Sequence, residues 1–261
     1  QALITGDKGF LGRHFTAELE RRGYEVTGMD TKTTPALDCR TYFRTYLSRG
    51  AVYQELNAEY FDLVVHCAAV VGGRETIERD PLATAESLSI DAEMFRWAAV
   101  ARPGRVLYIS SSAAYPVDHQ SDSVYGSRHE SDVWGERCGG LLMPDEVYGW
   151  SKVTGELLAD RLRKTGVPVT VVRPFSGYGA DQDPAYPFRA IIDRVKERNP
   201  GNLVLWCGDC VRDWIHVDDL VAGALAVAES GTEDPVNLCT GRPTSFRNLA
   251  GLMAAASPAY A

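Results

Sequence analysis

A tyrosine and a lysine four residues apart, Tyr148 and Lys152, form a pattern in this sequence that is suited to acid–base chemistry. The apolar periodicity around them predicts a helix over residues 145–164, and on a helix this spacing puts both side chains on one face. An ammonium close to a phenol stabilises the phenolate and lowers the pKa of the phenol from about 10 toward neutral pH. The pair would then be a general base for a sugar hydroxyl. A surface pair without any chemical role has the same spacing.

Three consecutive serines follow a strand that the sequence predicts over residues 105–110. Ser110, Ser111 and Ser112 would lie at the carboxyl edge of a parallel sheet, where active sites of such sheets form. One serine hydroxyl there could bridge a substrate hydroxyl and Tyr148. The serines also suit a strand-end cap, so the pattern does not by itself select one of them.

Glycines separate the first strand from the first helix. Gly6, Gly9 and Gly12 follow the apolar residues 2–5 and open a segment with helical apolar spacing. Glycine lets the chain turn sharply and brings backbone amides close to a pyrophosphate at the helix N-terminus. A simple glycine turn has the same pattern, so the glycines alone do not establish a dinucleotide site.

The strand predicted over residues 25–29 ends at Asp30. A carboxylate at this position accepts hydrogen bonds from the adenosine ribose and repels a 2′-phosphate, which favours NAD over NADP. The nearby Lys32 leaves room for NADP, and a turn or cap role for Asp30 is the alternative.

Strands and helices alternate through most of the chain, which predicts a parallel sheet covered on both faces. The fold class is therefore α/β. Further strands are predicted over residues 62–67, 105–110, 167–172 and 203–206, and further helices over residues 91–101, 188–198, 217–229 and 245–255.

The charge balance excludes several classes of protein. With 27 basic and 35 acidic residues the net charge is −8, whereas nucleic-acid and anionic-membrane binding need basic surfaces. No apolar run is long enough to span a bilayer, and no export signal precedes the first strand. We therefore expect a cytoplasmic enzyme with no nucleic-acid or membrane partner.

The six cysteines are scattered, which suits reduced thiols better than a disulfide scaffold. Cys207 and Cys210 form a C-x-x-C segment, but a zinc site needs four ligands and no second pair with suitable spacing is present. We expect no metal site and interpret these two cysteines as turn residues.

Several motifs, in order along the chain, resemble the extended short-chain dehydrogenase/reductase family, specifically its NAD-dependent nucleotide-sugar epimerase/dehydratase branch. They are Thr5-Gly6-x-x-Gly9-x-x-Gly12, Asp30, His66-Cys67-Ala68-Ala69, Ser110-Ser111-Ser112, Tyr148-x-x-x-Lys152, and the segments 173–179 and 212–220. The resemblance covers nearly the whole chain. It implies a doubly wound parallel Rossmann sheet with a smaller C-terminal substrate-binding lobe, and NAD as the cofactor.

The resemblance also implies site residues. The family places its catalytic serine or threonine four residues before a tyrosine, so Tyr115 selects Ser111. Ser111, Tyr148 and Lys152 would be catalytic. The cofactor would contact Gly6, Gly9, Phe10, Leu11, Gly12, Asp30, Asp38, Cys39, Ala68, Ala69, Tyr148, Lys152, Pro174 and Ser176. A nucleotide-diphosphate sugar would contact Ser111, Ser112, Tyr148, Ser176 and Arg212.

Two of these substrate positions have alternatives. Arg212 would grip the diphosphate through charge-assisted bonds, unless it is an ordinary ion-pair partner of Asp213. Ser176 stands where family members commonly carry asparagine, which puts the usual substrate hydrogen bond in doubt. His216 is expected to be structural, and the segment 186–188 is a further candidate for nucleotide contact.

Departures from the family pattern narrow the reaction. Sugar 4,6-dehydratases of the family carry an Asp-Glu pair where this chain has Ser112 and Ala113, and 3,5-epimerases place a cysteine at Ala113. Alanine cannot transfer a proton, although residues 71–73 and 115–116 do resemble the 3,5-epimerases. The remaining chemistry is hydride and proton transfer, which implies C4 epimerisation with NAD retained between the two hydride transfers.

Other functions stay open. A keto-sugar reductase or dehydrogenase that exchanges its cofactor would use the same side chains, and a 3,5-epimerase-type enzyme is a further alternative. A non-catalytic dinucleotide-binding protein would be expected to lack the Tyr148–Lys152 pair.

The resemblance divides the chain into two lobes. Residues 1–174 plus about 211–241 would bind NAD, and about 175–210 plus 242–261 would bind the substrate. Family members are usually somewhat longer, so the substrate lobe is expected to be incomplete at the C-terminus. Members often pair through the helices over residues 91–101 and 145–164, which predicts a homodimer.

Overall fold

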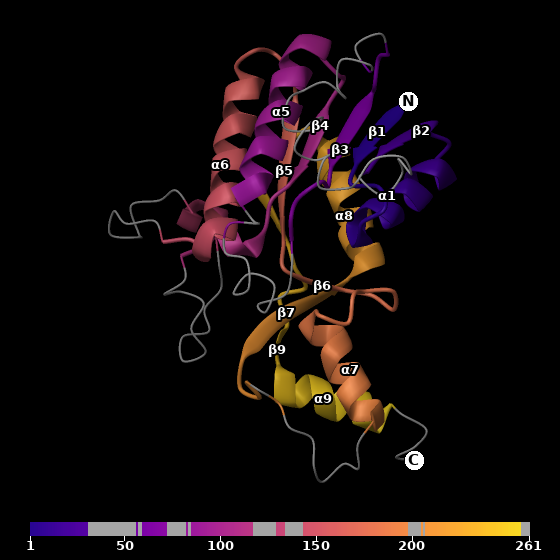
Figure 1. Ribbon diagram of the computed structural model, residues 1–261, viewed down its shortest axis with the longest axis vertical. Helices are drawn as coiled ribbons and strands as arrows, with labels where there is room; N and C mark the ends of the chain where they lie inside the picture. The colour runs from indigo at the N-terminus through magenta and orange to yellow at the C-terminus, as the bar shows by residue number, and fades with distance from the viewer. Residues whose placement is uncertain are drawn as a thin grey trace.

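The computed structural model describes residues 1–30, 56, 59–71, 82, 85–116, 129–133, 143–197, 205 and 207–256. Within them lies a six-stranded sheet in the order β2-β1-β3-β4-β5-β8, with every pair of neighbours parallel (Figure 1). The strands are β1 (Ala2–Thr5), β2 (Val26–Met29), β3 (Leu63–His66), β4 (Val106–Ile109), β5 (Val169–Pro174) and β8 (Val236–Leu238). The expected α/β class with a doubly wound parallel sheet is confirmed.

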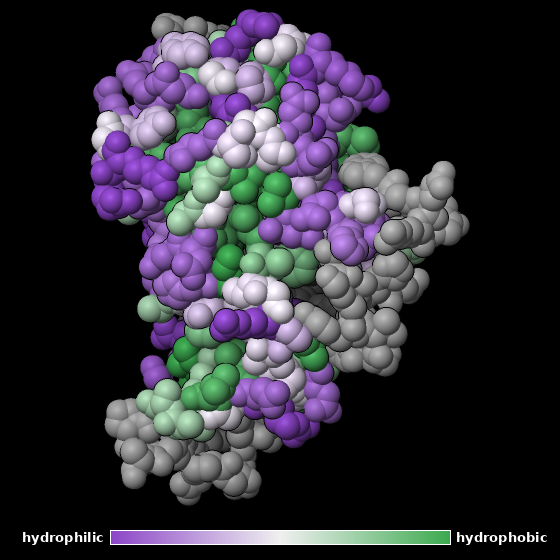
Figure 2. All heavy atoms as spheres, turned by 180° about the vertical axis from the view of Figure 1, so that it is seen from behind, coloured by the Kyte–Doolittle hydropathy of each residue, from purple (hydrophilic) through white to green (hydrophobic). Residues whose placement is uncertain are grey.

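In the part of the chain that the structure describes, helices lie against both faces of this sheet (Figure 1). On one face lie α5 (Glu86–Ala101) and α6 (Glu146–Arg163), and on the other lie α1 (Phe10–Arg21) and α8 (Val217–Ser230). Alternate residues of a strand point to opposite faces. In β1, Leu3 therefore packs in the core under α5 and α6, whereas Ala2 and Ile4 pack in the core under α1 and α8. Seen from behind in Figure 2, hydrophobic residues gather along the middle of the molecule, and hydrophilic residues cover its flanks.

A second, smaller sheet follows the main one, in the order β6-β7-β9. It consists of β6 (Ser176–Tyr178), β7 (Val211–His216) and β9 (Pro243–Ser245), and it lies beside α7 (Pro187–Glu197) and α9 (Phe246–Ala255) in the lower part of Figure 1. In this sheet β7 pairs with β6 and β9, and the division of the chain near residue 211 stays a prediction. The chain rejoins the main sheet with α8 and β8.

The sequence pattern did not identify the strands β6, β7, β8 and β9. Three of them have only three residues, which is too short for a periodic signal. The strand expected over residues 203–206 falls largely outside the described residues, and Leu205 is not in a strand.

Helix α5 begins at Glu86, five residues before the expected start at Asp91. In the structure the Asp91 carboxylate lies inside the helix and is 1% exposed. In the described parts of the chain, we find no helix with the length and apolar character needed to cross a membrane.

Candidate active site

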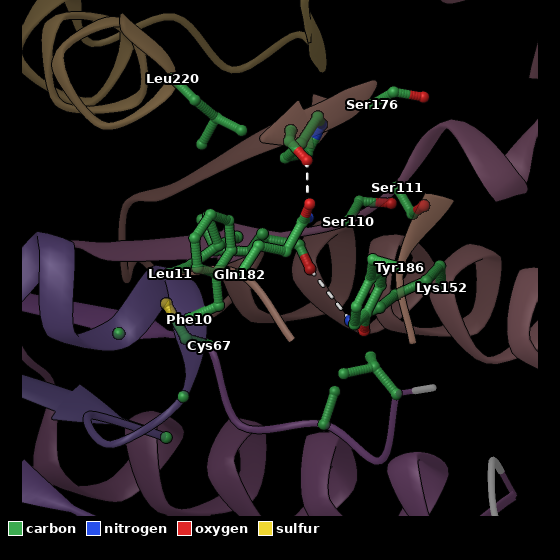
Figure 3. A pocket seen from close by; sticks show the side chains of 18 of the residues that line it. Phe10, Leu11, Cys67, Ser110, Ser111, Lys152, Ser176, Gln182, Tyr186 and Leu220 are labelled. Carbon is green, nitrogen blue, oxygen red and sulfur yellow. Dashed lines mark hydrogen bonds between the residues drawn. The ribbon is translucent and has the colours of Figure 1, made fainter. Parts of the chain in front are cut away.

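A cavity of about 640 Å³ lies at the carboxyl ends of β1, β3, β4 and β5. Its walls come from the glycine turn, from the segments after these strands, and from the second sheet (Figure 3). The predicted site residues that line it are Gly6, Gly9, Phe10, Leu11, Gly12, Asp30, Ala68, Ala69, Ser111, Tyr148, Lys152, Pro174, Ser176 and Arg212. Residues more than 200 positions apart in the sequence thus meet at one cavity, as the parallel sheet requires.

The glycine turn fits a dinucleotide. Gly6 has a φ of +73°, which favours glycine, and a Cβ there would lie 2.8 Å from the Ala68 nitrogen. A Cβ at Gly12 would overlap the carbonyl oxygen of Gly6, so the first turn of α1 packs directly on the loop. This leaves the N-terminus of α1 open to a pyrophosphate. The Asp30 carboxylate accepts a hydrogen bond from the Lys8 amide at 3.1 Å and lines the cavity where an adenosine ribose would bind.

Tyr148 and Lys152 lie on the same side of α6 and face the cavity. The Lys152 ammonium donates a hydrogen bond to the Ile109 carbonyl oxygen at 3.0 Å, and the residue is 4% exposed. Its Nζ lies 5.8 Å from the ring centroid of Tyr148 and 5.3 Å from that of Tyr108. The ammonium is therefore held in place by β4 beneath the tyrosine that it would activate.

The three serines differ in what they contact. Ser110 is buried and donates to a carboxylate oxygen of Glu156, whereas the Ser111 hydroxyl oxygen accepts from the Ala113 amide at 3.1 Å. Ser111 lines the cavity and still has its hydroxyl proton to donate. Ser112 begins the short helix η4 (Ser112–Ala114) and is not among the residues that line the cavity.

A buried ion pair that the sequence did not predict lies next to the serine segment, because Glu156 contacts both Ser110 and Arg173. Arg173 and Glu156 form a two-bond pair of 2.8 and 2.7 Å, with side chains 0% and 2% exposed. Arg173 also reaches the Tyr115 hydroxyl at 3.2 Å and the Glu130 carbonyl at 2.8 Å. The two partners come from β5 and α6, and their separation of 17 residues has no pairing signal of its own.

Arg212 lines the far side of the cavity on β7. Its guanidinium carbon lies 5.8 Å from the Phe246 ring centroid, and one nitrogen donates to the Val211 carbonyl at 2.8 Å. The Asp213 carboxylate instead accepts from the Thr240 amide at 2.7 Å and the Arg242 amide at 3.1 Å. The Asp213 carboxylate is thus engaged by backbone amides, so the alternative of an Arg212–Asp213 ion pair is not what the described residues show.

Further residues line the cavity near Arg212, among them Gln182, Tyr186, Phe188 and Trp214. Burial raises the pKa of the Tyr186 hydroxyl to about 12, so this group is a neutral hydrogen-bonding partner. The family resemblance predicted a nucleotide contact for the segment that contains Tyr186 and Phe188, whereas no pattern in the sequence pointed to Gln182 or Trp214.

Cys67 follows the carboxyl end of β3. Burial raises the pKa of its thiol to about 12, although the Lys152 ammonium acts in the opposite direction. Cys67 is therefore a neutral thiol in the cavity wall.

The expectation of reduced thiols is wrong at Cys207 and Cys210, which the structure joins as a disulfide. The turn between them brings their Cα atoms to 5.3 Å, within the usual range for a disulfide. His216 is structural, as expected: it caps the N-terminus of α8 by accepting from the Asp218 amide. Asp38, Cys39 and Lys32, together with most of the segment between residues 116 and 144, lie outside the described residues.

Comparison with known proteins identifies relatives of this chain. A model of the NAD dependent epimerase/dehydratase family matches residues 2–239. A dTDP-4-dehydro-6-deoxy-D-allose reductase of Streptomyces bikiniensis is 30% identical over 97% of this chain and 80% of its own. A putative UDP-glucose 4-epimerase of Methanocaldococcus jannaschii is 27% identical over 95% and 79%. The solved structure of TunA, an NAD dependent NDP-hexosamine 5,6-dehydratase, superposes with a TM-score of 0.77 at 23% identity, over 99% of this chain and 82% of that one.

Proposed function

This chain belongs to the NAD dependent epimerase/dehydratase family, and we propose that it is a C4 epimerase of a nucleotide-diphosphate sugar. The observation that supports this most is the meeting of Ser111, Tyr148 and Lys152 at one cavity with the glycine turn. These side chains transfer protons, and the position after Ser112 is Ala113, which cannot act as the acid that a sugar dehydration needs. Proton transfer beside a hydride acceptor is the chemistry that remains.

NAD, held at the turn of Gly6, Gly9 and Gly12, would supply reversible hydride transfer with the sugar carbon. Tyr148, as the phenolate, takes the proton of the sugar hydroxyl, and the Lys152 ammonium stabilises the negative charge on the phenol. The Ser111 hydroxyl donates a hydrogen bond to the same sugar oxygen. Arg212 holds the diphosphate while the keto-sugar turns its other face, and Tyr148 then returns the proton.

A keto-sugar reductase is the second candidate, and a specific observation favours it. Two of the curated relatives, both from Streptomyces and each similar over 97% of this chain, are dTDP-4-dehydro-6-deoxy-D-allose reductases. A reductase would use the same three side chains once per turnover and would exchange its cofactor. The two functions therefore differ in whether the cofactor is consumed.

The test is turnover with a panel of UDP-, GDP-, dTDP- and ADP-sugars, and with their 4-keto forms plus reduced cofactor. We expect an epimeric product without added reductant, and a loss of about 10²–10⁴-fold in turnover for Tyr148→Phe. Tyr60→Phe changes an exposed tyrosine outside the cavity and is the matched control. Near-normal turnover of Tyr148→Phe would overturn the proposal, and conversion only of the 4-keto forms would favour the reductase.

We further propose that the chain acts in the cytoplasm as a homodimer. The neighbouring helices α5 and α6 expose Val100, Trp150 and Leu157 at 75%, 46% and 44%. Exposed apolar residues on adjacent helices are typical of a contact surface between subunits. Sedimentation of the wild type and of Leu157→Glu tests this, because only the wild type is expected to be dimeric.

A further inference from the structure

A chain of buried hydrogen bonds runs beneath the catalytic lysine, through residues that the proposed reaction does not use. The Thr5 hydroxyl lies 2.6 Å from Nδ1 of His66, and Nε2 of His66 lies 3.0 Å from one oxygen of Asp91. The Tyr108 hydroxyl donates to the other Asp91 oxygen at 2.6 Å. All four residues are at most 2% exposed. They come from β1, β3, α5 and β4, so the contact exists only in the folded chain.

One arrangement of protons, with a neutral His66, satisfies each hydrogen bond in this chain. The Thr5 oxygen accepts from the Ala68 amide at 3.3 Å, which leaves its own proton for Nδ1 of His66. Nε2 of a neutral His66 then donates to Asp91. Burial and the nearby Asp91 raise the pKa of Tyr108 well above its ordinary value, so its hydroxyl also donates. Asp91 thus accepts two hydrogen bonds as a carboxylate, and the chain carries one buried negative charge.

A buried carboxylate is costly unless a positive charge compensates it. The ring of Tyr108 lies between Asp91, at its hydroxyl, and the Lys152 ammonium, 5.3 Å from its centroid. Among the residues that the structure describes, the other charged or titratable groups around Lys152 are Tyr148 and Glu156 on α6, Arg173 on β5, and His66 and Cys67 at the end of β3. Glu156 and Arg173 neutralise each other, which leaves Asp91 and Lys152 as opposite charges of similar depth.

Helix α6 carries a glycine, Gly155, where it packs against the Tyr108–Asp91 hydrogen bond. A Cβ at Gly155 would overlap the Tyr108 hydroxyl and would lie 2.8 Å from Asp91 Oδ2. Glycine weakens a helix interior relative to alanine, so its place here is explained by the close approach of the Tyr108–Asp91 pair. This approach occurs one turn after Lys152, on the helix that carries both proposed catalytic residues.

We propose that Asp91 is a positioning residue whose charge, acting across the Tyr108 ring, is the buried counter-charge of Lys152 and keeps the lysine protonated beneath Tyr148. This inference rests on the proposed role of Lys152 in the reaction. At its other end the chain of hydrogen bonds reaches the amide of Ala68, a residue that lines the cavity and is proposed to contact NAD. The hydrogen bonds of Asp91 thus connect it to the proposed cofactor site.

The test monitors the protonation of Lys152 directly, in the full chain without substrate. Isotope-labelled lysine side chains are titrated by NMR, with the Lys152 signal assigned by its loss in Lys152→Arg. In Asp91→Asn we expect the titration midpoint of Lys152 to fall by about one pH unit, because removing a buried negative charge favours the neutral amine. The alkaline limb of the pH–rate profile should move in the same direction.

Tyr108→Phe is the matched control, since it removes one buried hydrogen bond but keeps both the ring and the Asp91 charge. It should lose stability as Asp91→Asn does, yet shift the Lys152 midpoint much less. Equal shifts in the two variants, or an unmoved midpoint in Asp91→Asn, would overturn the inference and leave Asp91 a purely structural residue. If Asp91→Asn does not fold, Asp91→Leu combined with Tyr108→Phe removes the charge without leaving the tyrosine hydroxyl unpaired, and the same shift is expected.

The failure of the proposed function would look different. The wild type would then convert no sugar nucleotide and Tyr148→Phe would cost nothing, while the NMR midpoint would still report on the Asp91–Lys152 coupling.

Discussion

Glu156→Gln should destabilise the protein by about 3–5 kcal/mol, because it leaves a buried guanidinium without its counter-charge. Arg173 is 0% exposed, and Glu156 provides two of its hydrogen bonds, at 2.8 and 2.7 Å. The variant also weakens the contact from Ser110, the first of the three consecutive serines. For a chain of this size, a loss of this magnitude corresponds to a fall in Tm of roughly 6–20 °C.

Thermal and urea denaturation measure this loss, with Asp160→Asn as the matched control on the same helix. Asp160 pairs with Lys164 at 3.0 Å on the surface, and such exposed pairs contribute about 0.3–0.5 kcal/mol. The double variant Glu156→Leu with Arg173→Met removes both charges, so it should be more stable than either charge-removing single variant. A loss below about 1 kcal/mol in Glu156→Gln, or a double variant that is less stable than both singles, would refute the reasoning.

Three further predictions concern the cavity wall. Gly12→Ala should weaken NAD binding, measured by calorimetry, by about tenfold or more, because the added methyl group overlaps the Gly6 carbonyl and must displace α1. An unchanged affinity for NAD would contradict the role of the glycine turn in NAD binding. Asp30→Ser should raise the affinity for NADP relative to NAD by about tenfold, and a constant ratio would show that Asp30 does not face the ribose. The Cys67 thiol, with its pKa raised to about 12, keeps its proton where the unfolded chain has lost it, so the wild type should lose stability above pH 9.0. Urea denaturation across that pH range should show a smaller loss of stability in Cys67→Ala than in the wild type. Equal losses would contradict the raised pKa of the Cys67 thiol.

Much of the fold was predictable because its signals are local. The turn at Gly6, Gly9 and Gly12, the apolar strand before it and the helix after it need only short-range patterns. The strand β7 alternates in burial but carries Arg212 and Asp213, so its pattern resembled a loop. Asp91 shows the same limit, since no local pattern identifies its partners His66 on β3 and Tyr108 on β4.

The candidate site divides in the same way. Tyr148, Lys152 and Ser111 were predicted from spacing, from a strand end and from a family resemblance, and the structure brings them to one cavity. The Arg173–Glu156 pair and the partners of Asp91 were not predicted, because each joins segments that meet only after the sheet has formed. The disulfide between Cys207 and Cys210 was excluded on composition, although the turn geometry between them permits it.

The most direct test of the proposed reaction uses a nucleotide sugar that carries deuterium on C4. We predict that the purified enzyme with bound NAD forms the C4 epimer with the deuterium still on C4, that no reduced cofactor accumulates, and that Tyr148→Phe abolishes both the product and the transfer. An epimer that has exchanged its deuterium for a solvent proton would contradict the account, because the carbon would then have lost a proton rather than a hydride.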